Sequence, residues 1–158
     1  MEIRPAKVED GPAVCALWKQ LITRYNKKAE FKTLERSFRF AVGHPGQVRV
    51  YIAVLEGEVA GTASLHQGHY STWNDYWYGH IEDVIVAPAY RRRGVGEALV
   101  RHVVTAAGEL GLSRLELNAL CDNTLARTMY EKIGFVTDSV VYELPVGTAG
   151  GHSEPGAK

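Results

Sequence analysis

The sequence has few cysteines, no excess of charge of either sign and no long apolar run. Its two cysteines, Cys15 and Cys121, are too few for a disulfide scaffold and lack the spacing of metal ligands. Lysine plus arginine and aspartate plus glutamate number 18 each, so net charge favours neither nucleic acid nor a membrane surface as partner. No segment could span a bilayer, and none is typical of a signal peptide. We therefore expect a cytoplasmic protein without a metal.

Length and composition indicate one globular domain. The chain has 158 residues, of which 46% are apolar and 23% charged, as is ordinary for a folded domain with a real core. Residues 1–146 are expected to form this domain. Residues 147–158 are rich in Gly, Ala, Ser and Pro, and this composition predicts a disordered tail.

Apolar periodicity and breaker residues predict a single α/β (α+β) domain. Its mixed central sheet has a parallel βαβ core and is flanked by helices. Strands are predicted at 2–6, 48–55, 59–65, 80–86, 114–120 and 135–144, and helices at 8–25, 31–42, 95–110 and 123–133. The segment 70–78 holds five of the fifteen aromatic residues. It shows neither helical nor strand periodicity along its whole length.

The most informative stretch is 81–99, which reads as a buried strand, a loop with three arginines, a Gly-x-Gly turn and a helix. A helix start opened by glycines is an anion site, because free backbone N–H groups point outward there. A Walker A loop is excluded, since Glu97-Ala98 follows the second glycine. The match to a dinucleotide-binding fingerprint is weak. Leu99 stands where a third small residue is needed, and the seven residues 87–93 separate the strand from the turn.

A third phosphate-binding pattern, Arg-x-x-Gly-x-Gly, is matched by residues 91–96. Asn123 and the run Tyr130-Glu131-Lys132-Ile133-Gly134-Phe135 follow it in the order typical of one family. With these residues, between about 70 and 135, the chain resembles the GNAT superfamily of N-acetyltransferases, in which the pattern binds the pyrophosphate of acetyl-CoA. Tyr70-Ser71-Thr72-Trp73 ahead of Glu82-Asp83 is similar to the spermidine/spermine (diamine) branch, whereas Cys121-Asp122-Asn123 replaces its typical Asp-Trp-Asn.

The resemblance implies that a primary amine of a small molecule attacks the acetyl thioester directly, without a covalent enzyme intermediate. It implies Glu82 as general base through water, Tyr130 as general acid for the leaving thiolate, and the Val84 N–H as oxyanion donor. Strand alternation places His80, Glu82 and Val84 on one face and points Asp83 the other way.

The co-substrate implied by the resemblance is acetyl-CoA, and the family often forms homodimers. Its pantetheine arm would bind the main chain of residues 84–86 as an added strand, and the amides of 92–97 would hold its pyrophosphate. The residues expected to contact it are Val84, Ile85, Val86, Arg91, Arg92, Arg93, Gly94, Val95, Gly96, Glu97, Asn123, Ala126 and Tyr130.

Each assignment has a structural alternative. Glu82 could serve only in a structural ion pair, Tyr130 as a half-buried core residue and Asn123 as a helix N-cap. The aromatic segment 70–78 fits a wall of a cationic-amine pocket and equally a contact with a neighbouring subunit. A non-catalytic acyl-CoA sensor, a peptide or protein N-acetyltransferase and a dinucleotide-binding module remain alternatives at this point.

Overall fold

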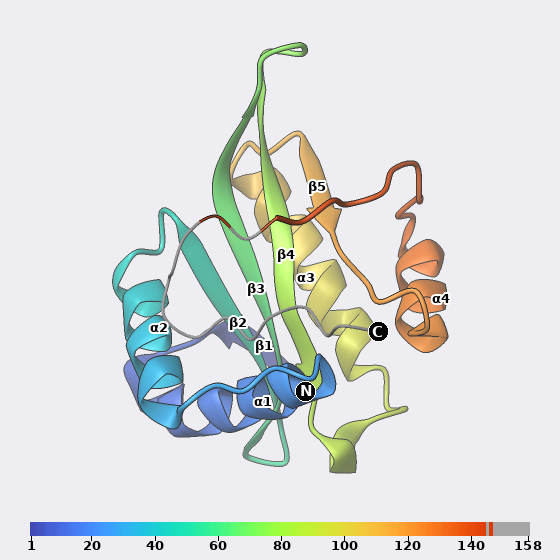
Figure 1. Cartoon of the computed structure of the whole chain (residues 1–158). Helices are drawn as coiled ribbons and strands as arrows, with labels where there is room; N and C mark the ends of the chain where they lie inside the picture. The colour runs from blue at the N-terminus through green and yellow to red at the C-terminus, as the bar shows by residue number, and fades with distance from the viewer. Residues whose placement is uncertain (145, 147–158) are drawn as a thin grey trace.

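The computed structural model describes residues 1–144 and 146, which fold around a five-stranded sheet (Figure 1). The strands lie in the order β1-β2-β3-β4-β5. They span Glu2–Pro5, Val48–Leu55, Glu58–Ser71, Tyr76–Val86 and Arg114–Leu117. Neighbours among β1 to β4 are antiparallel, and β4 and β5 are parallel. The predicted mixed sheet with a parallel βαβ unit is confirmed, and that unit is β4-α3-β5.

Helices cover both faces of the sheet. They are α1 (Gly11–Arg24), α2 (Phe31–Gly43), α3 (Val95–Glu109) and α4 (Thr124–Ile133), with single 3-10 turns at Val8–Asp10 and Pro88–Tyr90. One core cluster joins α1 and α2 to β2, and a second joins α3 and α4 to the opposite face of β2, β3 and β4. Figure 1 shows α1 in front of the sheet and α3 behind it. Within the residues described, no helix combines the length and apolar character needed to cross a membrane.

The turn between β2 and β3 is a two-residue loop formed by Glu56 and Gly57. Both residues have positive φ, 57° and 82°, as a type I′ turn requires. Leu55 and Glu58 are paired directly across it. The turn predicted between the strands at 48–55 and 59–65 is therefore confirmed.

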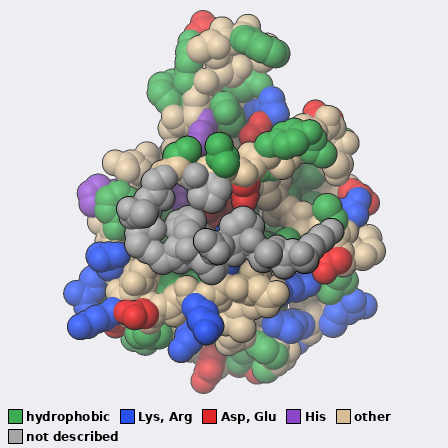
Figure 2. Space-filling view, viewed as in Figure 1, with side chains coloured by type: hydrophobic (Ala, Val, Ile, Leu, Met, Phe, Trp, Pro, Cys, Tyr) green, Lys and Arg blue, Asp and Glu red, His purple; other side chains and the backbone are tan. Residues whose placement is uncertain are grey.

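The β3–β4 hairpin is longer than the sequence pattern predicts and projects beyond the sheet as an arm (Figures 1 and 2). Its turn lies in the aromatic segment 70–78, where Trp73 is 94% exposed. Tyr70 and Trp77 are paired across the strands, with ring centroids 5.2 Å apart. Because neither face of the arm packs on the core, its side chains have no need to alternate between apolar and polar. The strands there carry no period-2 signal for this reason.

The strand predicted at 135–144 is wrong, because the structure describes no strand there. Phe135 packs on the core, but the large apolar side chains from Val136 to Leu144 face solvent, and Tyr142 is 91% exposed. The alternation of apolar and polar side chains breaks where Val140, Val141 and Tyr142 follow one another. The strand predicted at 114–120 ends at Leu117. The tail predicted at 147–158 lies outside the described residues.

The carboxylate of Asp10 fixes the entry to α1. It accepts two hydrogen bonds from Arg4, at 2.8 and 3.0 Å, and one from the Lys7 N–H at 2.7 Å. Mainly because of the Arg4 bonds, the pKa of Asp10 lies below its ordinary value of 3.8. The stabilisation that this implies is present above that value and is lost as the pH falls through the folded pKa.

Replacing Asp10 by Asn should lower the free energy of unfolding near neutral pH by about 1–2 kcal/mol, since charge-assisted hydrogen bonds are lost. Urea unfolding at a series of pH values measures the effect, which should shrink once the carboxyl of the wild-type protein is protonated. Glu9→Gln, at an exposed neighbouring position, is the control. A difference that stays constant down to acid pH would contradict the linkage.

Candidate active site

The parallel strands β4 and β5 separate, and this opens a gap beside β4. Pairing runs from Tyr78 with Arg114 to Ile81 with Leu117, while β4 continues to Val86. Within the described chain, no strand pairs with β4 on this side beyond Ile81. An edge of this kind can accept an extended ligand as an additional strand.

Backbone alternation determines which groups of β4 face the gap. The Ile85 carbonyl faces β3, since a Cβ added to Gly61 on β3 would lie 2.8 Å from it. The Ala87 N–H also donates to β3, at the Ala60 carbonyl. The N–H and C=O of Val84 and Val86 therefore point into the gap. The main chain of Ile85 is turned toward β3 instead, and its contact with a ligand stays a prediction.

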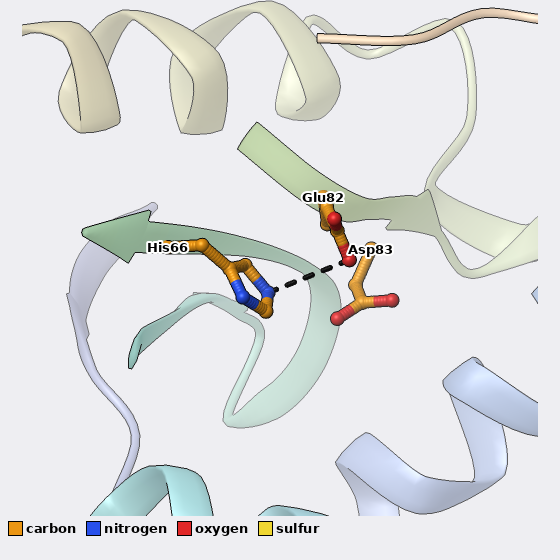
Figure 3. Close-up of side chains that lie close together, drawn as sticks. All are labelled: His66, Glu82 and Asp83. Carbon is orange, nitrogen blue, oxygen red and sulfur yellow. Dashed lines mark ion pairs between the residues drawn. The ribbon is translucent and has the colours of Figure 1, made fainter. Parts of the chain in front are cut away.

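A β-bulge at Asp83 changes which side chains share a face of β4. The pairing with β3 shifts between Thr62 and Ser64, and Asp83 adopts a positive φ of 53°. Val84 consequently packs against the α3 side of the core. Glu82 and Asp83 instead lie together on the other side, near His66 of β3 (Figure 3). The expectation that Glu82 and Val84 share a face while Asp83 points away is therefore wrong, because strict alternation fails at the bulge.

Two buried hydroxyl groups of β3 hold the bulge. Thr62 Oγ1 donates to the Asp83 carbonyl, and Ser64 Oγ donates to Asp83 Oδ2, each at 2.9 Å. Both β3 side chains are fully buried. Burial raises the pKa of the Asp83 carboxyl, and the Ser64 bond opposes this rise.

Glu82 lies between two histidines. His80 Nδ1 is 3.3 Å from Oε1, and His66 Nε2 is 3.5 Å from Oε2. The approach of His80 is the main cause that lowers the pKa of Glu82, against the effect of burial, and the pKa of His80 is raised in turn. The Glu82 side chain remains 49% exposed, so it is both ionised and accessible.

The start of α3 presents unclaimed backbone amides at the end of β4. Gly94 is the N-cap residue with φ 77°, and among the described residues no side chain caps this helix. A Cβ on Gly96 would lie 3.4 Å from both Met129 Sδ and Val86 Cγ2, in van der Waals contact, so Gly96 lies between β4 and α4. Such a helix start binds a phosphate through its N–H groups and its dipole.

The arginines before α3 brace this loop. Arg91 Nε donates to the Val86 carbonyl at 3.1 Å, and Arg93 forms an ion pair of 2.6 Å with Glu56 in the β2–β3 turn. Arg92 stands between them with a positive φ of 63°. Two of the three arginines predicted to contact a phosphate therefore also have bonds within the protein.

Helix α4 lies beside the start of α3. Glu97 forms ion pairs with Arg101 of its own helix, at 3.0 Å, and with Lys132 of α4, at 2.9 Å. The side chain of Glu97 thus joins the two helices, which leaves its backbone N–H for a ligand. Asn123 caps α4 by accepting a hydrogen bond of 3.4 Å from the Ala126 N–H, as its structural alternative predicts.

Tyr130 is 8% exposed within the core cluster that also contacts Val84. Its ring packs edge-on against Phe135, with centroids 6.0 Å apart. Burial, with a smaller effect of the nearby Tyr25, raises the pKa of Tyr130 to about 12. The hydroxyl is therefore fully protonated at neutral pH and can act as a proton donor.

Sequence reasoning missed the β3 side of the site, namely Thr62, Ser64 and His66. The register of the β3–β4 hairpin is the signal that could have found His66, because it pairs His66 directly with His80. The bulge left no recognisable pattern, because no glycine marks the positive φ of Asp83.

The chain is similar to known proteins over most of its length. A family model described as "Acetyltransferase (GNAT) family" matches residues 15–135. Streptothricin acetyltransferase of Streptomyces lavendulae is 36% identical over 113 residues, which are 69% of this chain and 56% of that protein. This chain therefore matches little more than half the length of that relative. Thialysine N-epsilon-acetyltransferase of Caenorhabditis elegans is 31% identical over 124 residues, 74% of this chain and 76% of that protein.

A solved structure shares the fold. It is that of a predicted acetyltransferase from Clostridium acetobutylicum with acetyl-CoA, and it is 21% identical to this chain. The TM-score is 0.75, with 91% of this chain and 95% of that chain covered.

Proposed function

Since this chain belongs to the acetyltransferase (GNAT) family and is an N-acetyltransferase, we propose that it transfers the acetyl group of acetyl-CoA to a primary amine of a small molecule. One observation carries the choice of co-substrate. The edge of β4 at Val84 and Val86, which pairs with no strand among the described residues, is followed after a short loop by the open amides at the start of α3. An extended amide-bearing arm that ends in a pyrophosphate fits these two features together.

Two sets of main-chain groups would bind the two parts of acetyl-CoA. The Val84 and Val86 main chain would hydrogen-bond the arm, and the N–H groups of Val95, Gly96 and Glu97 would hold the pyrophosphate. Bound acetyl-CoA supplies the reactive thioester. The Val84 N–H, which points into the gap, then stabilises the negative charge that develops on the thioester oxygen.

Glu82 activates the amine in this proposal. An alkylammonium cannot attack a thioester, so one proton must leave it first. The carboxylate of Glu82 is ionised and half-exposed, which allows it to take that proton through a water molecule. Its negative charge also attracts a cationic amine.

Tyr130 completes the transfer. Its hydroxyl donates a proton to the departing thiolate and regains one from solvent. The phenol stays protonated across the physiological range, so it has a proton to donate. The proposed acceptor class is supported by the relatives that are named for small amines, streptothricin and thialysine.

Tyr130→Phe should lower kcat about a hundredfold, the order expected for loss of a general acid, and leave acetyl-CoA affinity nearly unchanged. The ring that packs on Phe135 is retained, so folding should not account for the change. Steady-state kinetics and calorimetric binding measure the two quantities. Tyr51→Phe, at a buried tyrosine of the same core, is the matched control. A large loss of affinity would contradict the assignment.

Gly96→Glu should abolish acetyl-CoA binding, because it places bulk and negative charge at the amides that hold the pyrophosphate. Gly108→Glu makes the same change in the last turns of α3, where a Cβ has open space, and should bind normally. Calorimetry with both variants compares the two positions. Normal affinity in Gly96→Glu would rule out this helix start as the phosphate site.

The proposed activity is tested by measuring CoA release from acetyl-CoA with a panel of acceptors. The panel holds polyamines, amino acids, aminoglycosides, arylamines and peptide N-termini. We expect turnover with at least one class of small amine and a smaller kcat/KM with peptides. Turnover confined to peptides would overturn the proposed acceptor class.

A further inference from the structure

We propose that His66, Glu82 and Asp83 form a site for a divalent transition-metal ion such as Zn²⁺, and that a metal bound there competes with the amine. One ligand atom from each of the three residues lies within 4.8 Å of the other two (Figure 3). The competition rests on the proposed function, whereas metal binding rests only on these side chains.

The bulge on β4 creates this arrangement. In a regular strand two consecutive carboxylates point to opposite faces, but the positive φ of Asp83 turns both toward His66. Ligands of one tetrahedral zinc ion lie about 3.3 Å apart, given bonds of about 2 Å. His66 Nε2 and Glu82 Oε2 are already 3.5 Å apart, and Glu82 is free enough to adjust.

Two histidine nitrogens approach the Glu82 carboxylate without a well-aligned hydrogen bond. Among residues 1–144 and 146, His66 Nε2 and His80 Nδ1 are buried atoms without an aligned hydrogen bond. A metal ion bound to His66 Nε2 would replace this poorly aligned contact by a direct bond.

Neighbouring groups orient two of the ligands. His80 Nδ1 lies 3.3 Å from Glu82 Oε1, the oxygen turned away from His66. Ser64 donates to Asp83 Oδ2 and fixes the second carboxylate. Partners of this kind set ligand direction in metal sites.

The donor set decides the class of ion. One imidazole nitrogen with two carboxylates suits Zn²⁺ and related transition metals, whereas Mg²⁺ and Ca²⁺ prefer oxygen ligands alone. Two adjacent carboxylates also provide a charge that a divalent cation neutralises. Glu82 and His66 are both partly exposed, so an ion can enter from solvent.

The same carboxylates would meet the incoming amine in the proposed reaction. A metal that occupies Glu82 removes the proton acceptor and places positive charge where a cationic substrate must bind. The inhibition should therefore depend on the amine concentration and be independent of the acetyl-CoA concentration.

Binding is tested on the full chain, prepared without added histidines and freed of metal by dialysis against a chelator. Zn²⁺ calorimetry should show one equivalent, and Co²⁺ should give visible absorption typical of low coordination. His66→Gln and Asp83→Asn should each weaken binding by at least about tenfold, since they remove a ligand. His44→Gln, at an exposed histidine of another face, and Cys121→Ser, at an exposed thiol, should bind as wild type. Unchanged affinity in the first two variants, or a loss in Cys121→Ser alone, would overturn the site.

Competition is tested by kinetics at free Zn²⁺ concentrations set by a metal buffer, because the thiol of released CoA also binds zinc. Zn²⁺ should raise the apparent KM for the amine and leave that for acetyl-CoA unchanged. Zinc binding without this effect would overturn the competition and the placing of the amine at Glu82. Zinc binding in a protein that acetylates no amine would uphold the metal site and count against the proposed function.

Discussion

Two hydrogen bonds from buried hydroxyls on β3 to one residue of β4 determine the rest of the candidate site. Thr62 holds the carbonyl of Asp83 and Ser64 holds its carboxylate, so the chain keeps a left-handed residue inside a strand. Such a backbone conformation costs free energy, of the order of 1 kcal/mol or more, and persists only where its surroundings enforce it. The bulge sends Val84 to one side of the sheet and both carboxylates to the other. It thus separates the groups proposed to meet the thioester from those proposed to meet the amine.

The gap between β4 and β5 is the second feature on which the candidate site depends. The strands stay paired up to Ile81 and then part, so the free edge begins next to the bulge. Since Val84 and Val86 alternate with Ile85, the edge offers two residues to a ligand and uses the third to hold the sheet together. The start of α3 follows after a short loop. The proposed contacts therefore follow one another along the chain: the base Glu82 first, then the main chain of Val84 and Val86, then the phosphate-binding amides of α3.

The sequence predicted those parts of the fold that depend on local patterns. The Gly-x-Gly start of α3, the turn at Glu56–Gly57 and the parallel βαβ unit were all predicted from nearby residues, and the structure confirms them. Features that depend on pairing between distant segments were missed. Periodicity places Asp83 on the wrong face because the bulge is specified from β3, by Thr62 and Ser64. The segment 135–144 has apolar residues suited to a strand but no partner in the described structure, so its pattern misled the prediction. The roles of individual site residues stay predictions.

The ion pair between Arg93 and Glu56 has a consequence for how this chain tolerates change. A tight hairpin turn at the surface is ordinarily a place where insertions do little harm. Here the turn carries the carboxylate that braces the loop before α3, at 2.6 Å from the guanidinium. One inserted residue would rotate Glu56 away and release Arg93. The length of a turn remote in sequence therefore affects the loop that it touches, by up to about 1 kcal/mol for an exposed ion pair.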